Sequence, residues 1–594
     1  MKLPRLAFPA VSAQIPSPMT DAVDNPPPSR WTAVGLFLLF FVPFIPAVNW
    51  TEFSGGMENF NVGTAQEMVR RGNWLLPTLN GEIRTKKPPL ATWMSAIGMK
   101  LTGSLPWGAR LPNVLCTGLL AAATYYFGRE IGGHRLGVIA SLVGSSSFLV
   151  LQHAIPAQYD MPYAVCITLA NLYLAKLALR GCWWEGCLGA GFWLGLAFMA
   201  KGPLPALLMT VAPFVACAFI RWIPDAPQQP VTPVLAAIRP GQVLEYEAIR
   251  PEPRAPVATR QFPSVTASTR VLAVLAGLGV LALVAMPWTI YVLYATAGRA
   301  HEWYNETTLR DERVNEEHSW WWKYVLVVPW FAPWALWYVV GLLALCFEKW
   351  RPLRRRMLLV VLMVGLPLLV MSFFPVRRPR YVLPLAAPLA VLAAWRIEQH
   401  FARPEAWKKA DRLLVFGHGA IMTALAVGLP VAGMFFVRTV DGDPWYGMPL
   451  GFASLAIMAA VLALMWRRMA DWRWHVGGSA VLMLMLAVLF LRGYKDSPNG
   501  RSPAKLLAAR LLERYPGAEY YSDSHKGHDA PTELTIYLNS EVRRCANPAK
   551  LRASTRPQVL FVGTEQERTP DRPGWRLVDK QRIAKAWWYA MVRE

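Results

Sequence analysis

The chain has 594 residues, of which 54% are hydrophobic and 17% are charged. Soluble domains carry about a quarter charged residues, whereas apolar runs long enough to cross a bilayer recur along this sequence. These runs are continuous, which is not the alternating pattern of a β-barrel. The net charge of +23 gathers in short loops between apolar runs, so it indicates membrane orientation and not nucleic-acid binding.

The cysteines and the amino-terminal segment show no sign of export as a disulfide-bonded protein. Most of the seven cysteines lie in or beside apolar segments, and they predict neither a disulfide framework nor a zinc site. Residues 1–31 are polar and proline-rich, without the basic start and short apolar core of a cleavable signal peptide. We expect them to form a cytoplasmic tail, with the first apolar segment as the anchor.

Thirteen segments are predicted to span a membrane, because each is a long apolar run. They cover residues 32–49, 110–128, 136–156, 162–180, 187–200, 203–222, 271–296, 324–347, 357–375, 382–396, 413–437, 448–466 and 475–491. The apolar stretch 89–103 is too short to span, and we expect a helix lying at the membrane interface there. The predicted fold class is an all-α polytopic membrane domain at residues 32–492.

Charge sets the orientation of these spans. With thirteen spans and a cytoplasmic amino terminus, the arginine-rich loops 129–135, 348–356 and 467–473 all face the cytoplasm, as the positive-inside rule requires. The proline-rich loop 223–270 lies on the same side and is predicted to be poorly ordered. The first long loop, residues 50–109, then lies on the outer side.

Residues 493–594 form a separate polar domain on the outer side. Within it, "AKLLAARLLERYP" has the period of a helix, while "ELTIYLN" and "QVLFVGT" have the composition of buried strands. We therefore predict a small carboxy-terminal α/β domain, which contains no recognisable motif.

The first outer loop is rich in charge. The segment "NVGTAQEMVRRGNW" predicts a surface helix that ends at Gly72. Further on, Lys86 and Lys87 precede Pro88 and Pro89, which set the turn into the interfacial helix. A solvated loop whose cations contact lipid headgroups is the alternative, and the residue pattern alone favours it.

Asp160, in "IPAQYDMPY", stands where a predicted helix leaves the membrane. A carboxylate at this boundary is a candidate functional residue. The alternative is a helix N-cap ahead of Pro162, and residue preferences favour that alternative.

The outer segment "HEWYNETTLRDERVNEEHSWWWK" contains residues that bind metals in other proteins. The candidates are His301, Glu302, Glu316, Glu317 and His318. Their spacing matches no known ligand signature. A solvated loop anchored by its tryptophans explains the segment at least as well.

Arginines also gather in "RRPRYVLPLAAPLAVLAAW", on the outer side, where the positive-inside rule does not call for cations. Arg377, Arg378 and Arg380 surround a proline, and arginine forks match the geometry of phosphate. We interpret the cluster as a phosphate site, with lipid-headgroup contact as the alternative. No nucleotide-binding motif or nucleophile elbow occurs, so an activated substrate would arrive through the membrane.

Four stretches in order resemble the family 39/83-type glycosyltransferases, which include the protein O-mannosyltransferases and the aminoarabinose transferase that modifies lipid A. They are "AQEMVRRGNWLLPTLNGEIRTKKPPLATW", "GARLPNVLCTGLLAAATYYFGREIGG", "QYDMP" and "RRPRYVLPLAAPLAVLAA". The resemblance extends across roughly the first 400 residues. It implies a GT-C membrane fold in the bacterial inner membrane, with the active site and the carboxy-terminal domain on the periplasmic side.

The resemblance also implies residue roles. An acidic residue of the first loop, here Glu58, acts as a base or positions the acceptor, and Asp160 matches the acid of the second outer loop. Lys87, in the "KPP" motif, contacts the carrier phosphate, assisted by Tyr381 and Arg380.

His318 lies where some members of this family place a metal-binding or acceptor-contacting histidine. The resemblance is thus compatible with a divalent metal cofactor and does not require one.

The implied activity is transfer of a sugar from a polyprenyl-phosphate carrier to a lipid, glycan or protein acceptor, usually with inversion. Membrane lipids are implied as partners, and nucleic acid is not. Cations near the leaving phosphate stabilise the charge that develops as the glycosidic bond breaks.

The sequence departs from the family pattern in three places. It has Met57-Glu58 where an Asp-Glu pair is common, Phe60-Asn61 where Arg-Tyr follows, and Lys86 where an acid often precedes the motif lysine. Two alternatives stay open. One is a protein that binds or transports the carrier through the same cations without transferring sugar, and the other, suggested by Phe60-Asn61, is a degenerate member that acts as a scaffold.

Overall fold

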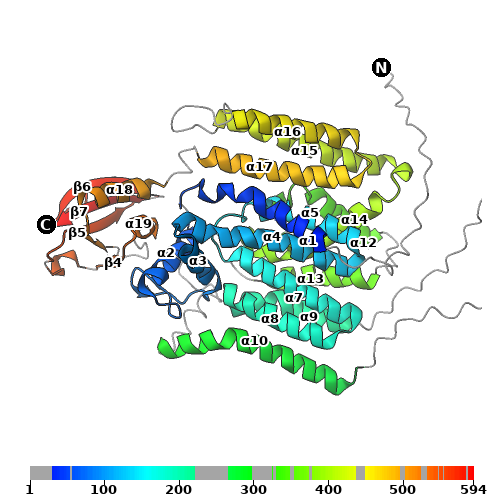
Figure 1. The fold of residues 1–594 in the computed structure, drawn as a ribbon, viewed down its shortest axis with the longest axis horizontal. Coiled ribbons are helices and arrows are strands. Elements are labelled where there is room, and N and C mark those ends of the chain that lie inside the picture. The colour runs from blue at the N-terminus through cyan, green and yellow to red at the C-terminus, as the bar shows by residue number, and fades with distance from the viewer. Residues whose placement is uncertain are drawn as a thin grey trace, which may run out of the picture.

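The computed structural model shows a helical bundle with a small sheet domain at one end (Figure 1). Helices α2 (Gly56–Arg71) and α3 (Leu90–Thr102) lie between the bundle and the sheet. The structure describes residues 30–53, 56–220, 265–296, 324, 329–347, 354–373, 378–436, 449–495, 502–523, 532–545, 547–552, 554–583 and 586–593. The predicted tail 1–31 and loop 223–270 fall mostly outside these ranges.

Long helices and the short helix α6 form the bundle. They are α1 (Arg30–Phe41), α4 (Leu105–Gly132), α5 (His134–Ser145), α6 (Phe148–Leu151), α7 (Asp160–Arg180), α8 (Trp183–Lys201), α9 (Pro203–Ile220), α10 (Ala267–Ala295), α12 (Ala335–Phe347), α13 (Arg354–Ser372), α14 (Ala386–His400), α15 (Lys409–Phe436), α16 (Pro449–Arg467) and α17 (Gly478–Lys495). The 3₁₀ helix η7 (Pro379–Leu385) leads into α14. Each predicted span overlaps a helix, since an apolar run of this length satisfies its backbone best as a helix.

The chain is a multi-pass membrane protein. Within the part that the structure describes, seven helices are long and apolar enough to cross a membrane. Among them, α7 and the η7–α14 segment are mostly buried, whereas α10 and α15 expose most of their apolar surface. The centre of the bundle therefore consists of α4, α5, α7 and α14, with α10 at its edge. The count of thirteen spans stays a prediction.

The predicted span 136–156 is not one continuous helix. It divides into α5 and α6, because serine side chains at the junction bond to the backbone of the preceding turn. Ser146 Oγ donates to Leu142 O at 2.6 Å, and Ser147 Oγ donates to Gly144 O at 2.7 Å. Such bonds from a side chain to the backbone compete with the backbone hydrogen bonds that would continue the helix.

The first loop forms α2, the hairpin of β1 (Thr78–Leu79) and β2 (Glu82–Ile83), and α3. As predicted, α2 ends before Gly72, which has a φ of 72° that favours glycine. The helix begins earlier than predicted, at Gly56, so that Glu58 lies in its first turn. The predicted short helix at 89–103 is also present, as α3.

The carboxy-terminal domain contains α18 (Pro503–Arg514), β3 (Glu519–Ser522), α19 (Thr532–Leu538), β4 (Val542–Arg544), β5 (Gln558–Thr564), β6 (Arg576–Ile583) and β7 (Ala586–Arg593). Its five strands are ordered β4-β3-β5-β7-β6. Strand β3 pairs parallel to β4 and β5, and β7 pairs antiparallel to β5 and β6. The predicted α/β character, the α18 helix and the β5 strand are confirmed.

The predicted strand in "ELTIYLN" is wrong, because this segment is the helix α19. Leu534 and Leu538, one helical turn apart, pack into the core of the sheet domain. Ile536 packs on another face of the helix, against residues of the first loop. Burial on two faces gave this short helix the continuous apolar pattern of a buried strand.

Helices α8 and α10 approach each other closely through glycines. A Cβ added at Gly191 would lie 2.1 Å from the carbonyl oxygen of Gly277, whereas one added at Gly279 would meet no atom within 4 Å. We predict that Gly191→Ala lowers the stability of the detergent-solubilised protein by about 1–3 kcal/mol, because the helices must separate. Thermal unfolding checks this, with Gly279→Ala as the matched control. Equal midpoints for the two variants would contradict the packing argument.

Candidate active site

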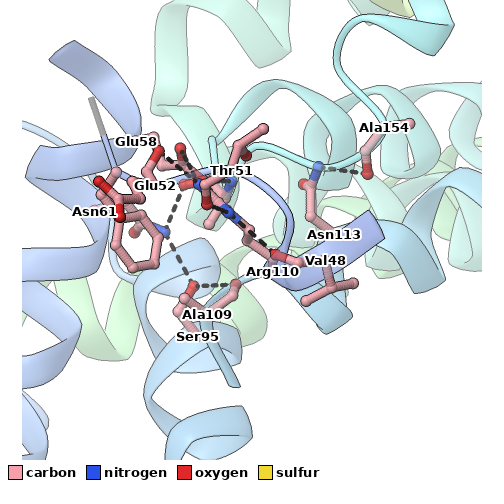
Figure 2. A network of polar contacts seen from close by, with 12 residues as sticks. Val48, Thr51, Glu52, Glu58, Asn61, Ser95, Ala109, Arg110, Asn113 and Ala154 are labelled. Atoms are coloured by element: carbon pink, nitrogen blue, oxygen red, sulfur yellow. Dashed lines mark hydrogen bonds and ion pairs between the residues drawn. The ribbon is translucent and has the colours of Figure 1, made fainter. Parts of the chain in front are cut away.

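A buried ion pair lies at the base of the first loop (Figure 2). Arg110, near the start of α4, donates from Nε to Glu58 Oε1 at 2.7 Å and from Nη2 to Glu58 Oε2 at 3.0 Å. Arg110 is 1% exposed and Glu58 is 7% exposed. Such a bidentate pair fixes both distance and orientation.

The rest of the Arg110 guanidinium holds the chain that leads from α1 into the first loop. Its other hydrogens are donated to three backbone carbonyls, those of Val48 at 3.0 Å, Thr51 at 2.6 Å and Glu52 at 3.4 Å. The guanidinium also lies 4.4 Å from the ring centroid of Phe53. All five donors that arginine possesses are therefore used.

Glu58 and Asn61 together hold the segment that precedes α7. Glu58 Oε1 accepts the backbone N–H of Ala157 at 2.9 Å, and Asn61 Nδ2 donates to the carbonyl of the same residue at 3.0 Å. Asn61 also donates to Ser95 Oγ at 3.1 Å and accepts from Thr92 Oγ1 at 2.8 Å, both on α3. One face of α2 thus joins α3 to the approach to α7.

Three residues after Ala157, Asp160 contributes to a second cluster. Its Oδ1 accepts from Lys201 Nζ at 2.5 Å. The same ammonium lies 5.1 Å from the ring centroid of Tyr163 and 4.9 Å from that of Tyr381. Arg380 Cζ lies 5.8 Å from the Tyr381 centroid. Side chains from α7, α8 and η7 therefore place two cations, a carboxylate and two aromatic rings together.

The ends of α7 and α8 set the positions of Asp160 and Lys201. Asp160 is the first residue of α7, and the N-cap of this helix is Tyr159, with no side-chain capping bond. The N-cap interpretation of Asp160 is therefore wrong, and its side chain contacts Lys201 instead. Lys201 is the last residue of α8, which ends at Gly202 with a φ of 111°. Buried ions need partners, and this pair supplies them to each other.

Of the predicted phosphate-binding residues, Arg380 and Tyr381 belong to this cluster, and Arg380 is close enough to Asp160 for an electrostatic interaction. Lys87 comes from another side, in the half-exposed turn before α3. The start of α3 packs on the end of α8: Leu90 joins a cluster that contains Met199, two residues before Lys201. The helix that follows Lys87 therefore contacts the helix that ends at Lys201.

The metal hypothesis finds no support in the described part of the chain, where no three His, Cys, Asp or Glu side chains form a group suited to a metal ion. His318 and the remainder of its segment lie outside the described residues. The role suggested for His318 stays a prediction.

Arg110 and Lys201 were not among the predicted site residues. Each lies at the end of a predicted span on its predicted outer side, where the positive-inside rule does not call for a cation. That rule singled out the arginines at 377–380, and the same test applied to single cations would have found these two.

Comparison with known proteins supports the predicted relationship. Residues 86–226 match the dolichyl-phosphate-mannose-protein mannosyltransferase family. An undecaprenyl phosphate-α-4-amino-4-deoxy-L-arabinose arabinosyl transferase 1 from Pseudomonas fluorescens Pf0-1 is 26% identical over 392 residues, which cover 63% of this chain and 58% of that relative. The corresponding transferase of Pseudomonas aeruginosa UCBPP-PA14 is 24% identical over 480 residues, or 78% of this chain and 76% of the relative.

The fold comparison covers nearly the whole chain. The crystal structure of ArnT from Cupriavidus metallidurans, bound to undecaprenyl phosphate, aligns with a TM-score of 0.64 at 14% identity and covers 94% of this chain and 97% of its own. The chain has the GT-C fold. The resemblance inferred from the four motifs is confirmed, and the chain is similar to the undecaprenyl phosphate-α-4-amino-4-deoxy-L-arabinose arabinosyl transferases.

The Glu58–Arg110 pair provides a test of the site's architecture. We predict that Glu58→Gln destabilises this GT-C protein by about 3–5 kcal/mol, because it leaves the Arg110 charge buried without a counter-ion. Thermal unfolding in detergent measures the change, and Glu82→Gln, at an exposed position of the same loop, is the control. Equal stability of the two variants would mean that the pair does not organise the loop.

Proposed function

We propose that the chain is an inner-membrane glycosyltransferase that takes a sugar from a polyprenyl-phosphate carrier. The acceptor is a lipid, glycan or protein on the periplasmic side. The observation that carries the proposal is the cluster of Lys201, Arg380, Tyr381 and Asp160 in an ArnT-like fold. The names of the relatives make undecaprenyl phosphate-linked 4-amino-4-deoxy-L-arabinose the first donor to test.

The cations have a direct part in this reaction. An acceptor oxygen attacks the anomeric carbon, the bond from that carbon to the phosphate oxygen breaks, and the carrier phosphate leaves with the bonding electrons. Lys201 and Arg380, with Lys87 from the turn before α3, would bind that phosphate. Cations already held in place stabilise its growing negative charge without reorganisation. The aromatic rings of Tyr163 and Tyr381 limit the access of water to Lys201, which strengthens the interaction.

The two predicted acidic residues take different parts in the proposal. Glu58 is bound at both oxygens by Arg110 and Ala157, so its contacts support a positioning role. Asp160 lies among the cations, and it is our candidate to accept the proton that the acceptor loses. In the absence of substrate, Lys201 balances its charge.

The proposed orientation rests on the charge pattern. The arginine-rich loops 129–135 and 467–473 face the cytoplasm in the predicted topology, which places Asp160, α2 and the carboxy-terminal domain in the periplasm. A carrier lipid in the outer leaflet would then reach the cluster with its phosphate at the membrane surface.

Two observations favour a second candidate, a protein that binds or transports the carrier without transferring sugar. Both oxygens of the first-loop acid Glu58 already accept hydrogen bonds, and Met57 occupies the neighbouring position where an acid is common in the family. Such a protein would bind undecaprenyl phosphate through the same cations. It would leave the envelope glycolipids and glycoproteins unchanged.

We predict that Lys201→Met lowers sugar transfer at least about 100-fold, because a preorganised cation at the leaving phosphate is lost. Lys87→Ala and Arg380→Gln reduce transfer in the same direction. Lys176→Met, on α7 at the Glu185 ion pair, is the control. Transfer is measured in membranes after the variants are shown to fold by gel filtration. Normal turnover in a folded Lys87→Ala protein would contradict its assigned role.

Mass spectrometry of the cell envelope, with and without the protein, tests the function itself. We expect one glycolipid or glycoprotein to lose a sugar when the protein is absent, and to regain it on complementation with the wild type but not with Lys201→Met. An unchanged envelope, together with binding of undecaprenyl phosphate, would favour the binding protein.

A further inference from the structure

Helix α19 of the carboxy-terminal domain belongs to two cores. Leu534 and Leu538 pack with the sheet, whereas Ile536 packs with residues of the first loop and of the bundle, including Phe53, Val62 and Ala157. Figure 1 shows α19 beside α2, between the sheet and the bundle. An apolar contact thus packs the carboxy-terminal domain against the first loop, which carries Glu58.

The outer face of α2 and the hairpin after it are also bound to this domain. Asn59 Nδ2 donates to Glu533 Oε1 at 3.1 Å, and Arg71 pairs with Glu541 at 2.5 Å. Asn80, at the tip of the hairpin, accepts from Thr535 Oγ1 at 2.7 Å. The opposite face of α2 carries Glu58 and Asn61, so the helix lies between the domain and the candidate site.

Tyr537 connects the domain to the buried ion pair through one residue, Phe53. Its hydroxyl accepts the backbone N–H of Phe53 at 2.7 Å and lies 3.3 Å from the carbonyl of the same residue. The Phe53 ring packs against the guanidinium of Arg110. From Arg110 the contacts continue through Glu58 to the Ala157 peptide, three residues before Asp160.

We propose that Tyr537 is a positioning residue for sugar transfer, acting through Phe53 and the Arg110–Glu58 pair on the segment that ends at Asp160. The inference rests on the proposed function and assigns the carboxy-terminal domain a part in the reaction itself. Tyr537 contacts no cation of the Lys201 cluster in the described structure. Its loss therefore changes the geometry of the carboxylate without removing the phosphate-binding charges.

Tyr537→Phe removes only the hydroxyl and leaves the N–H of Phe53 without its partner. Tyr520→Phe is a matched control, because the Tyr520 hydroxyl is buried in the same domain with no hydrogen-bond partner among the described residues. The full-length proteins are compared in nanodiscs. The measurements are hydrogen–deuterium exchange in residues 152–160, binding of undecaprenyl phosphate, and transfer from undecaprenyl phosphate-linked aminoarabinose to extracted envelope glycolipid.

We expect Tyr537→Phe to exchange faster in residues 152–160 and to lose about 5- to 30-fold in kcat, while its binding of undecaprenyl phosphate stays within twofold of the wild type. Tyr520→Phe should match the wild type in all three measurements. If Tyr537→Phe equals Tyr520→Phe in exchange or in kcat, the inference is overturned. A loss of carrier binding that accounts for the lower rate would overturn it as well, since the defect would then lie in the cation cluster.

Failure of the proposed function gives a different result. In that case the wild-type protein itself transfers no sugar from the carrier to envelope material. Transfer then gives no information, and hydrogen–deuterium exchange in residues 152–160 of Tyr537→Phe decides whether the connection from the domain to Asp160 exists.

Discussion

The arrangement of the outer face depends on the ion pair between Arg110 and Glu58. Both ions are buried, and an unpaired ion there would carry a large desolvation cost. The cost is offset because every donor of Arg110 is used and both oxygens of Glu58 are bound. Few other positions of these segments would satisfy so many directional bonds at once. The pair therefore fixes the start of the first loop, α2, α4 and the approach to α7 in one arrangement, although they are distant in sequence.

The three hydrogen bonds that Glu58 accepts leave this carboxylate little capacity to take a proton from a substrate. The carboxylate that lies beside cations is Asp160, and its partner Lys201 is held between Tyr163 and Tyr381. An arriving phosphate would compete with Asp160 for Lys201 and would free the carboxylate as it binds. Binding of the donor and readiness of the acid are thus linked through one ammonium group.

The sequence predicted features that depend on local composition. Apolar length located the helices of the bundle, and Gly72 ended α2 because its conformation excludes most side chains. Features set by tertiary contacts were missed. Helix α19 is apolar on two faces because it packs against two domains, which no local pattern distinguishes from a strand. Lys201 and Arg110 are single cations, and their partners come from segments more than forty residues away. Glu58 and Asp160 were found from motifs, but only the structure gave their contacts.

The departures from the family pattern at Phe60-Asn61 acquire a physical meaning in this fold. Asn61 is buried, and both its amide group and its carbonyl are bonded, to α3 and to Ala157. Phe60 is covered by the guanidinium of Arg84, 4.9 Å from its ring centroid. Buried polar groups are costly when one partner is lost, and Asn61 keeps a partner for each of its polar groups. The two residues therefore indicate a first loop that is stabilised by contacts other than those of an Arg-Tyr pair.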